Sequence, residues 1–123
     1  NLEIKSVEEL TSYDAGKRNS AAFQTLLYCE LYLRETGIET VRPALYPVRM
    51  LFNEKFSDLF VTGKGNDALV IERYSMVRDT FLGHLTSVIE DILDPSVDFK
   101  MTGDRQKCKF CPYSGICERE DMK

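Results

Sequence analysis

Three cysteines near the C-terminal end of the sequence carry its clearest chemical pattern. Cys108, Cys111 and Cys117 follow a C-x2-C-x5-C spacing. Two thiols separated by two residues can turn toward one metal-sized point, and a third that follows a tight turn can close another side of the same site. Thiolates select zinc or an iron–sulfur cluster. The spacing therefore predicts a metal site, and three unconnected thiols packed in a small apolar tail are the alternative.

A four-ligand site would need one more ligand, and the sequence offers two soft candidates. Cys29 falls in a segment expected to form a buried helix, where a cysteine is a core residue more often than a ligand. His84, the only histidine, is expected on the polar face of another helix, exposed to solvent. Neither is predicted as a ligand, so the metal identity and its occupancy in this chain stay open.

A glutamine and a tyrosine form a second pattern. Gln24 and Tyr28 are four residues apart, so they share one face of the expected helix. Spacing alone favours a structural role for both. Lys17 and Arg18 stand just before that helix, where a basic pair and free backbone amides can hold a phosphate. A solvated loop is the alternative for this pair.

The acidic residues form no convincing catalytic set at this stage. Asp14 and Asp58 are expected as single loop acids. Glu90 and Asp91 are expected on the solvent side of a helix. We recognise no acid followed by an E-x-K element in a strand, no Ser-His-Asp arrangement and no dinucleotide fingerprint. The segment 63–65, Gly-Lys-Gly, lacks the phosphate-loop pattern and is interpreted as a hairpin turn.

The elements that must position these residues follow from spacing and capping signals. The segment 6–9, Ser-Val-Glu-Glu, is typical of a capping box and predicts a short helix through about Tyr13. Ser20 can cap a longer helix that ends at Gly37. The remaining expectations are a strand over 41–51 that two prolines weaken, a hairpin of 59–61 with 68–71, a helix over 75–93 that Pro95 ends, and an extended tail from 96 with a last helical turn at 114–119.

The length of 123 residues favours one domain, with a helix-sheet-helix core over 20–95 and a cysteine-rich tail over 96–123. The expected class is α+β (mixed α/β), with two main helices plus a small sheet or hairpin. A hydrophobic content of 43% and a charged content of 29% are typical of soluble globular proteins, and a net charge of −4 gives no global attraction to a polyanion. The sequence has no apolar run long enough for a membrane span and no signal peptide, which favours a cytoplasmic location.

Two elements together resemble one family. Phe23-Gln-Thr-Leu-Leu-Tyr28 has a Q-x3-Y pattern, and the cysteine-rich segment from Cys108 to Arg119 follows a long amphipathic helix. In this order they resemble the C-terminal part of RecB/AddB-type nucleases of the PD-(D/E)XK superfamily. The resemblance covers most of the chain, roughly residues 17–119.

The resemblance implies a partial restriction-endonuclease-like core, a mixed sheet flanked by helices. It implies that Gln24 and Tyr28 border the active site and help to place DNA. It implies that Lys17 and Arg18 contact the DNA backbone. The three cysteines match three ligands of an iron–sulfur staple, and zinc is the other candidate. The parent nuclease would use Mg or Mn in DNA repair or recombination, with DNA as substrate and a helicase as partner.

The sequence also departs from that family pattern. No Asp-Tyr-Lys-Thr-Gly element precedes Gln24, and the segment 13–17 is only a faint echo of it. The upstream cysteine of the staple and the catalytic carboxylates and lysine are not recognised. We therefore expect a fragment, or a degenerate homologue, that does not cut DNA by itself. Its apolar helix over 20–37 would be covered by unusual packing or in a homodimer.

Two rival functions stay open at this point. One is a small zinc- or iron–sulfur-binding interaction module without catalytic activity. The other is a DNA-binding remnant, whose affinity would fall steeply with salt because phosphate contacts release counterions.

Overall fold

The computed structural model describes residues 2–12, 19–54, 56–63, 65–98 and 100–119. Its contacts divide the chain into two compact units, Asn1–Glu90 and Asp91–Lys123, which are described separately below. The described elements are two α-helices, three short strands and several 3-10 turns. These helices and the small sheet confirm the expected α+β class.

A three-stranded sheet joins the N-terminus to the middle of the chain. Strand β1 (Leu2–Ile4) pairs in parallel with β2 (Phe60–Thr62), with Ile4 opposite Thr62. Strand β2 pairs antiparallel with β3 (Leu69–Val70), as the hairpin prediction required. Gly63 opens the turn with φ of 85°, and a Cβ there would collide with the carbonyl oxygen of Asp67, so the turn needs glycine at this position.

Helix α1 (Ser20–Thr36) has well-defined caps at both ends. The side chain of Asn19, rather than that of Ser20, accepts a hydrogen bond from the backbone N–H of Ala22 at 3.1 Å. Gly37 ends the helix in the left-handed conformation with φ of 67°, as the sequence predicted. The capping residue therefore lies one position before the predicted one.

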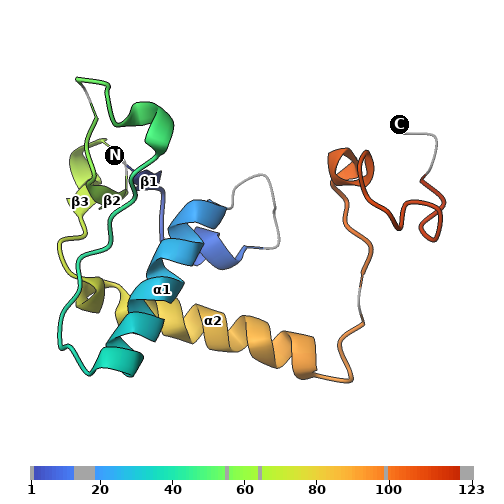
Figure 1. Ribbon diagram of the computed structural model, residues 1–123. Helices are drawn as coiled ribbons and strands as arrows, with labels where there is room; N and C mark the ends of the chain where they lie inside the picture. The colour runs from blue at the N-terminus through green and yellow to red at the C-terminus, as the bar shows by residue number, and fades with distance from the viewer. Residues whose placement is uncertain (1, 13–18, 55, 64, 99, 120–123) are drawn as a thin grey trace. The chain divides into compact units, whose positions relative to one another are not determined.

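Helix α2 (Arg78–Leu93) begins after a 3-10 turn at Tyr74–Met76, three residues later than predicted. The two helices cross in the first unit (Figure 1). At the crossing the Phe23 and Phe81 rings meet edge to face with centroids 5.6 Å apart, and Tyr74 packs on Phe81 at 6.3 Å. Phe81 and Leu26 are completely buried there. Aromatic pairs of this geometry add to the apolar burial that stabilises the core.

Two predicted elements are wrong. Residues 41–51 form no strand but an extended segment followed by a 3-10 turn at Val48–Met50. Pro43 and Pro47 lack the N–H groups that a ladder needs, and the Val41 carbonyl instead accepts a hydrogen bond from Tyr74 N–H at 2.9 Å. The helix predicted after Ser6 is reduced to a single 3-10 turn, Glu8–Thr11, without a side-chain cap; the end predicted at Tyr13 lies outside the described residues.

The second unit contains a 3-10 turn at Arg105–Cys108, where Asp104 accepts a hydrogen bond from Gln106 N–H at 3.1 Å. Hydrogen-bonded turns follow up to residue 118, rather than the predicted helical turn. Cys108 and Ser114 are buried in this unit. Within the described parts of the chain, neither helix has both the length and the apolarity needed to cross a membrane.

Candidate functional site

The N-terminal strand and the residue after it form an E-x-K pattern that was not recognised in the sequence. Glu3 and Ile4 belong to β1, and Lys5 follows directly. The acid of this pattern therefore belongs to the strand, and the lysine lies just beyond its end. Ile4, between them, is buried in the core. Leu2, the strand residue before Glu3, is not acidic, so the expectation that no acid followed by an E-x-K element stands in a strand is not contradicted.

Lys5 is exposed at the end of β1. Its Nζ lies 3.4 Å from Oε1 of Glu9, one turn further along the chain. The N–H of Gly63 lies 3.1 Å from the Lys5 carbonyl oxygen and fixes its backbone against the β2–β3 turn. An exposed ion pair of this kind contributes at most about 1 kcal/mol, so the lysine head can leave Glu9 at little cost.

The two helix residues predicted to border an active site share a groove. Gln24 and Tyr28 line an open groove of about 490 Å³ along one face of α1, and both are exposed. The opposite wall comes from residues 41–45. The groove also contains Tyr32, one turn beyond Tyr28, and Arg42. The structure thus brings Gln24 and Tyr28 together on a surface that a ligand can reach.

A cluster of polar groups stabilises the segment 41–45, which lines the groove opposite α1. Arg42 forms an ion pair with Asp58, and the Tyr46 hydroxyl donates to the same carboxylate at 2.9 Å. Hydrogen bonds from Tyr46 and Arg42 hold the pKa of Asp58 below its usual value. Asp58 is therefore not the isolated loop acid that the sequence suggested, and its role here is to fix Arg42 beside the groove.

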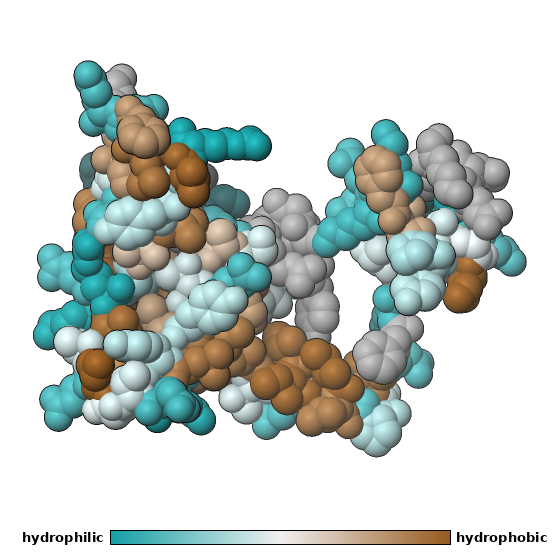
Figure 2. Space-filling model, viewed as in Figure 1, coloured by the Kyte–Doolittle hydropathy of each residue, from teal (hydrophilic) through white to brown (hydrophobic). Residues whose placement is uncertain are grey.

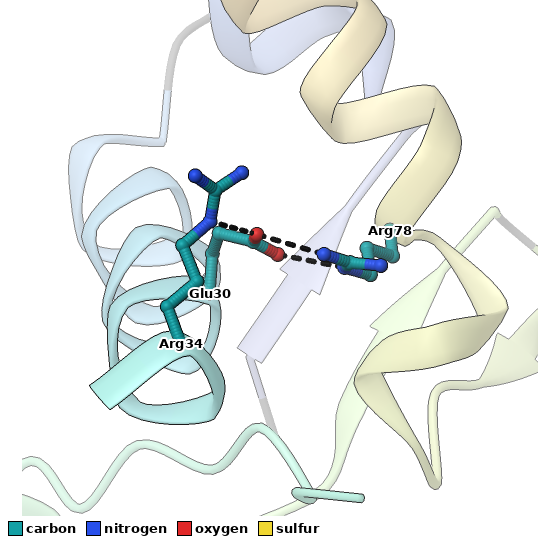
Figure 3. A network of polar contacts seen from close by, with 3 residues as sticks. All are labelled: Glu30, Arg34 and Arg78. Carbon is teal, nitrogen blue, oxygen red and sulfur yellow. Dashed lines mark hydrogen bonds and ion pairs between the residues drawn. The ribbon is translucent and has the colours of Figure 1, made fainter. Parts of the chain in front are cut away.

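A buried carboxylate joins α1 to α2 (Figure 3). Glu30 accepts hydrogen bonds from Arg78 at 2.8 and 2.9 Å and from Arg34 at 2.6 Å. The bonds from Arg78 lower the pKa of Glu30 to about 2, although burial opposes this shift. Burial, and then the charge of Glu30, raise the pKa of Tyr74. The ion pairs keep α1, with its Gln24 and Tyr28, aligned against α2.

The cysteines divide into two environments. Cys29 is a core residue, as predicted, and burial raises the pKa of its thiol. Cys108 is buried in the second unit, and its Sγ accepts a hydrogen bond from Arg119 Nη1 at 3.4 Å. Cys111 and Cys117 are half-buried, and all four described cysteines are free thiols.

The fit of a metal can be tested on this geometry. Among the described residues, no three His, Cys, Asp or Glu side chains gather closely enough to hold an ion. Cys108, Cys111 and Cys117 supply suitable sulfur donors without that arrangement. We therefore derive no reaction step through a metal. The predicted phosphate contacts Lys17 and Arg18 lie outside the described residues, and His84 lies 4.0 Å from Glu8 with its side chain partly exposed.

Comparison with protein families places the chain in a known superfamily. The model of the PD-(D/E)XK nuclease superfamily matches residues 3–118. The chain belongs to this superfamily. No curated protein and no solved structure matches it. Membership of a nuclease superfamily implies an interaction with DNA.

The name of the superfamily itself describes the pattern of residues 3–5, which begins in β1: an acid, any residue and a lysine. The sequence signal was available, because Glu3, Ile4 and Lys5 stand only nineteen residues or so before the Q-x3-Y segment. A three-residue strand is too short to show an alternating pattern, and a Pro-Asp dipeptide is absent from the sequence. Pairing with β2, far along the chain, is what identifies these residues as a strand.

Proposed function

We propose that this chain is the E-x-K and Q-x3-Y portion of a RecB/AddB-type, metal-dependent DNA exonuclease module of DNA repair or recombination. Glu3 would supply the acid and Lys5 the lysine of the superfamily pattern. Gln24 and Tyr28 would border the active site, and Lys17 and Arg18 would contact the DNA backbone. The observation that carries the proposal is the order of β1, α1 and β2, with the two strands parallel, the E-x-K residues at the end of β1 and the Q-x3-Y residues on α1.

The chemistry of such a site divides between a divalent ion and the protein. Mg or Mn would supply Lewis-acid chemistry at such a site, and Glu3 would be one of the residues that hold the ion. A lysine ammonium near the scissile phosphate stabilises the negative charge that develops on its oxygens. Because only one carboxylate of the pattern is assigned here, we retain the prediction that this chain alone does not cleave DNA. A helicase partner and a homodimer are further parts of the proposal.

The three C-terminal cysteines belong to the same proposal. Cys108, Cys111 and Cys117 would bind an iron–sulfur cluster or zinc and staple the tail to the nuclease core. A structural metal stabilises a small tail because its binding free energy becomes folding free energy. The superfamily match over residues 3–118 argues against an interaction module of unrelated ancestry.

The test is cleavage of end-labelled linear DNA in Mg²⁺ or Mn²⁺. This chain alone should leave the DNA intact, and cleavage by it would contradict the prediction of inactivity. Where a form of the protein does cleave DNA, Glu3→Gln and Lys5→Met should each lower its cleavage rate at least about 100-fold. That factor corresponds to about 3 kcal/mol of activation free energy. Glu72→Gln, an exposed acid outside the site, is the matched control. Equal rates for all three variants would refute the assignment of Glu3 and Lys5.

A further inference from the structure

One segment of the C-terminal tail, residues 105–119, differs from the rest of the chain in charge. Residues 105–119 contain four basic residues and one acidic residue, whereas the whole chain carries a net charge of −4. Arg105, Lys107 and Lys109 are all exposed. Arg119 is engaged inside the unit, donating to the Thr102 carbonyl at 2.7 Å and to Cys108. The segment 105–119 of the tail is thus a local basic patch on an acidic protein, and such a patch attracts polyanions.

The same tail exposes aromatic rings. Phe110 is 88% exposed and Tyr113 is 66% exposed. Figure 2 shows apolar residues in brown beside hydrophilic residues in teal on the surface of this tail. Leaving a phenylalanine side chain in water forgoes about 1.5–3 kcal/mol of burial free energy. Two such rings within four residues give this segment an exposed aromatic surface.

The basic and aromatic groups are interleaved. Lys109 Nζ lies 5.6 Å from the centroid of the Phe110 ring, within the range of a cation–π contact. Lys109, Phe110, Cys111 and Pro112 line a hollow of about 480 Å³. A cation and a ring at the same hollow can contact the phosphate and the base of one nucleotide together. This combination is typical of surfaces that bind single-stranded nucleic acid.

We propose that the tail binds single-stranded DNA, with Phe110 and Tyr113 stacked on unpaired bases and Arg105, Lys107 and Lys109 in contact with backbone phosphates. The choice of DNA as ligand rests on the nuclease function proposed above. Unpaired bases are required because a ring can stack only on a base face that duplex neighbours do not cover. Contact through base faces tolerates any sequence. The tail is built from turns, whereas surface binding to membranes uses an amphipathic helix.

The stacking contact is tested by fluorescence anisotropy of the full chain with a labelled oligothymidylate. Phe110→Ala and Tyr113→Ala should each weaken binding about tenfold, within the range known for base–aromatic stacking. Phe52→Ala removes a ring that is 95% exposed in the other unit and should leave binding unchanged. An abasic oligonucleotide of the same length offers neither ring a base, so it should bind the unchanged protein more weakly than oligothymidylate binds the Phe110 variant.

The phosphate contacts are tested by the salt dependence of the same binding. The double variant Lys107→Gln/Lys109→Gln should lower the slope of log K against log salt by about 1.4, since each single-strand phosphate contact contributes about 0.7. Lys100→Gln, an exposed lysine outside the segment, should leave the slope unchanged. A duplex of the same length should bind more weakly and respond less than twofold to Phe110→Ala.

Several results would overturn the inference. They are equal effects of Phe110→Ala and Phe52→Ala, equal affinity for abasic and thymidylate oligonucleotides, or binding of anionic phosphatidylserine vesicles without binding of oligonucleotides. The nuclease proposal fails separately. If substitutions of Glu3 and Lys5 do not change cleavage, the nuclease proposal fails, but the tail can still bind single-stranded DNA. If the tail does not bind single-stranded DNA, those substitutions can still lower cleavage.

Discussion

The two units of this chain differ in how many apolar side chains each one buries inside itself. In the first, Phe60, Tyr74 and Phe81 are almost completely buried and bring the sheet and both helices around one apolar core. In the second, Cys108 and Ser114 are the buried described residues, while Phe110 and Ile116 are more than 80% exposed. A unit of this size with so little apolar burial depends on hydrogen bonds or a bound metal for its order.

The largest expected change in the free energy of unfolding comes from replacing a phenylalanine of the first unit by alanine. The same replacement in the second unit is the comparison. Phe81→Ala should lower the free energy of unfolding by about 3–5 kcal/mol, because it removes a fully buried ring that contacts both Phe23 and Tyr74. Phe110→Ala should change it by less than about 0.5 kcal/mol. Urea unfolding followed by circular dichroism measures both values. Similar losses for the two variants would erase the contrast between the units.

A smaller effect is expected from the ion pairs that join the helices. Glu30 has a pKa of about 2 in the folded chain, below the ordinary value of 4.5. Its contribution to stability is therefore complete above about pH 4.5 and is lost as the pH falls from there through about 2. Because Arg34 and Arg78 are partly exposed, we expect this contribution to be about 1–3 kcal/mol.

Glu30→Gln removes the charge and keeps a similar shape. This variant should be less stable at pH 7 and should lose less stability between pH 5 and pH 2.5 than the unchanged chain. Thermal unfolding across this pH range is the measurement. Glu35→Gln, an exposed neighbour on the same helix, is the control and should follow the unchanged chain. A parallel pH profile for the Glu30 variant would show that the ion pairs contribute nothing.

The smallest effect on global unfolding is expected in the tail. Cys111→Ser should change the unfolding of the first unit by less than about 0.5 kcal/mol, since this half-buried thiol lies outside its core. If the tail takes up zinc or an iron–sulfur cluster as proposed, metal-loaded protein should show slowed amide hydrogen exchange over residues 108–119, and Cys111→Ser should abolish that protection. Elemental analysis of the same anaerobic preparation reports the metal. Unchanged exchange after loading would count against the staple.

Some of this fold followed from local signals in the sequence. The apolar spacing of residues 77–92 predicted α2, and Gly37 marked the end of α1. Gly63 and its neighbours marked the β2–β3 turn because only glycine fits the backbone there. The Q-x3-Y and cysteine patterns indicated the superfamily, which the match over residues 3–118 confirmed. The finer RecB/AddB assignment and the metal at the cysteines stay predictions.

The candidate site depended more strongly on contacts between distant residues. Apolar residues alternate in the segment 41–51 as they do in a strand, but its two prolines lack the N–H groups that strand pairing needs. Part of the segment lines a groove instead. The E-x-K residues were overlooked because a three-residue strand carries no periodicity, and only a parallel neighbour about sixty residues away defines that strand. Parallel strands require a long crossover connection, so local spacing cannot reveal their partner.

The sequence by itself determined the two helices, the glycine turn, the family and the types of residue available for chemistry, because these depend on spacing and backbone preference within a few positions. The tertiary structure decided which residues share a site. It paired β1 with β2, which places Glu3 and Lys5 in and beside a sheet, and it buried Glu30 against an arginine 48 residues away. A glutamate in a helix is ordinarily solvated. Only the approach of a second helix that supplies compensating charge makes its burial stable.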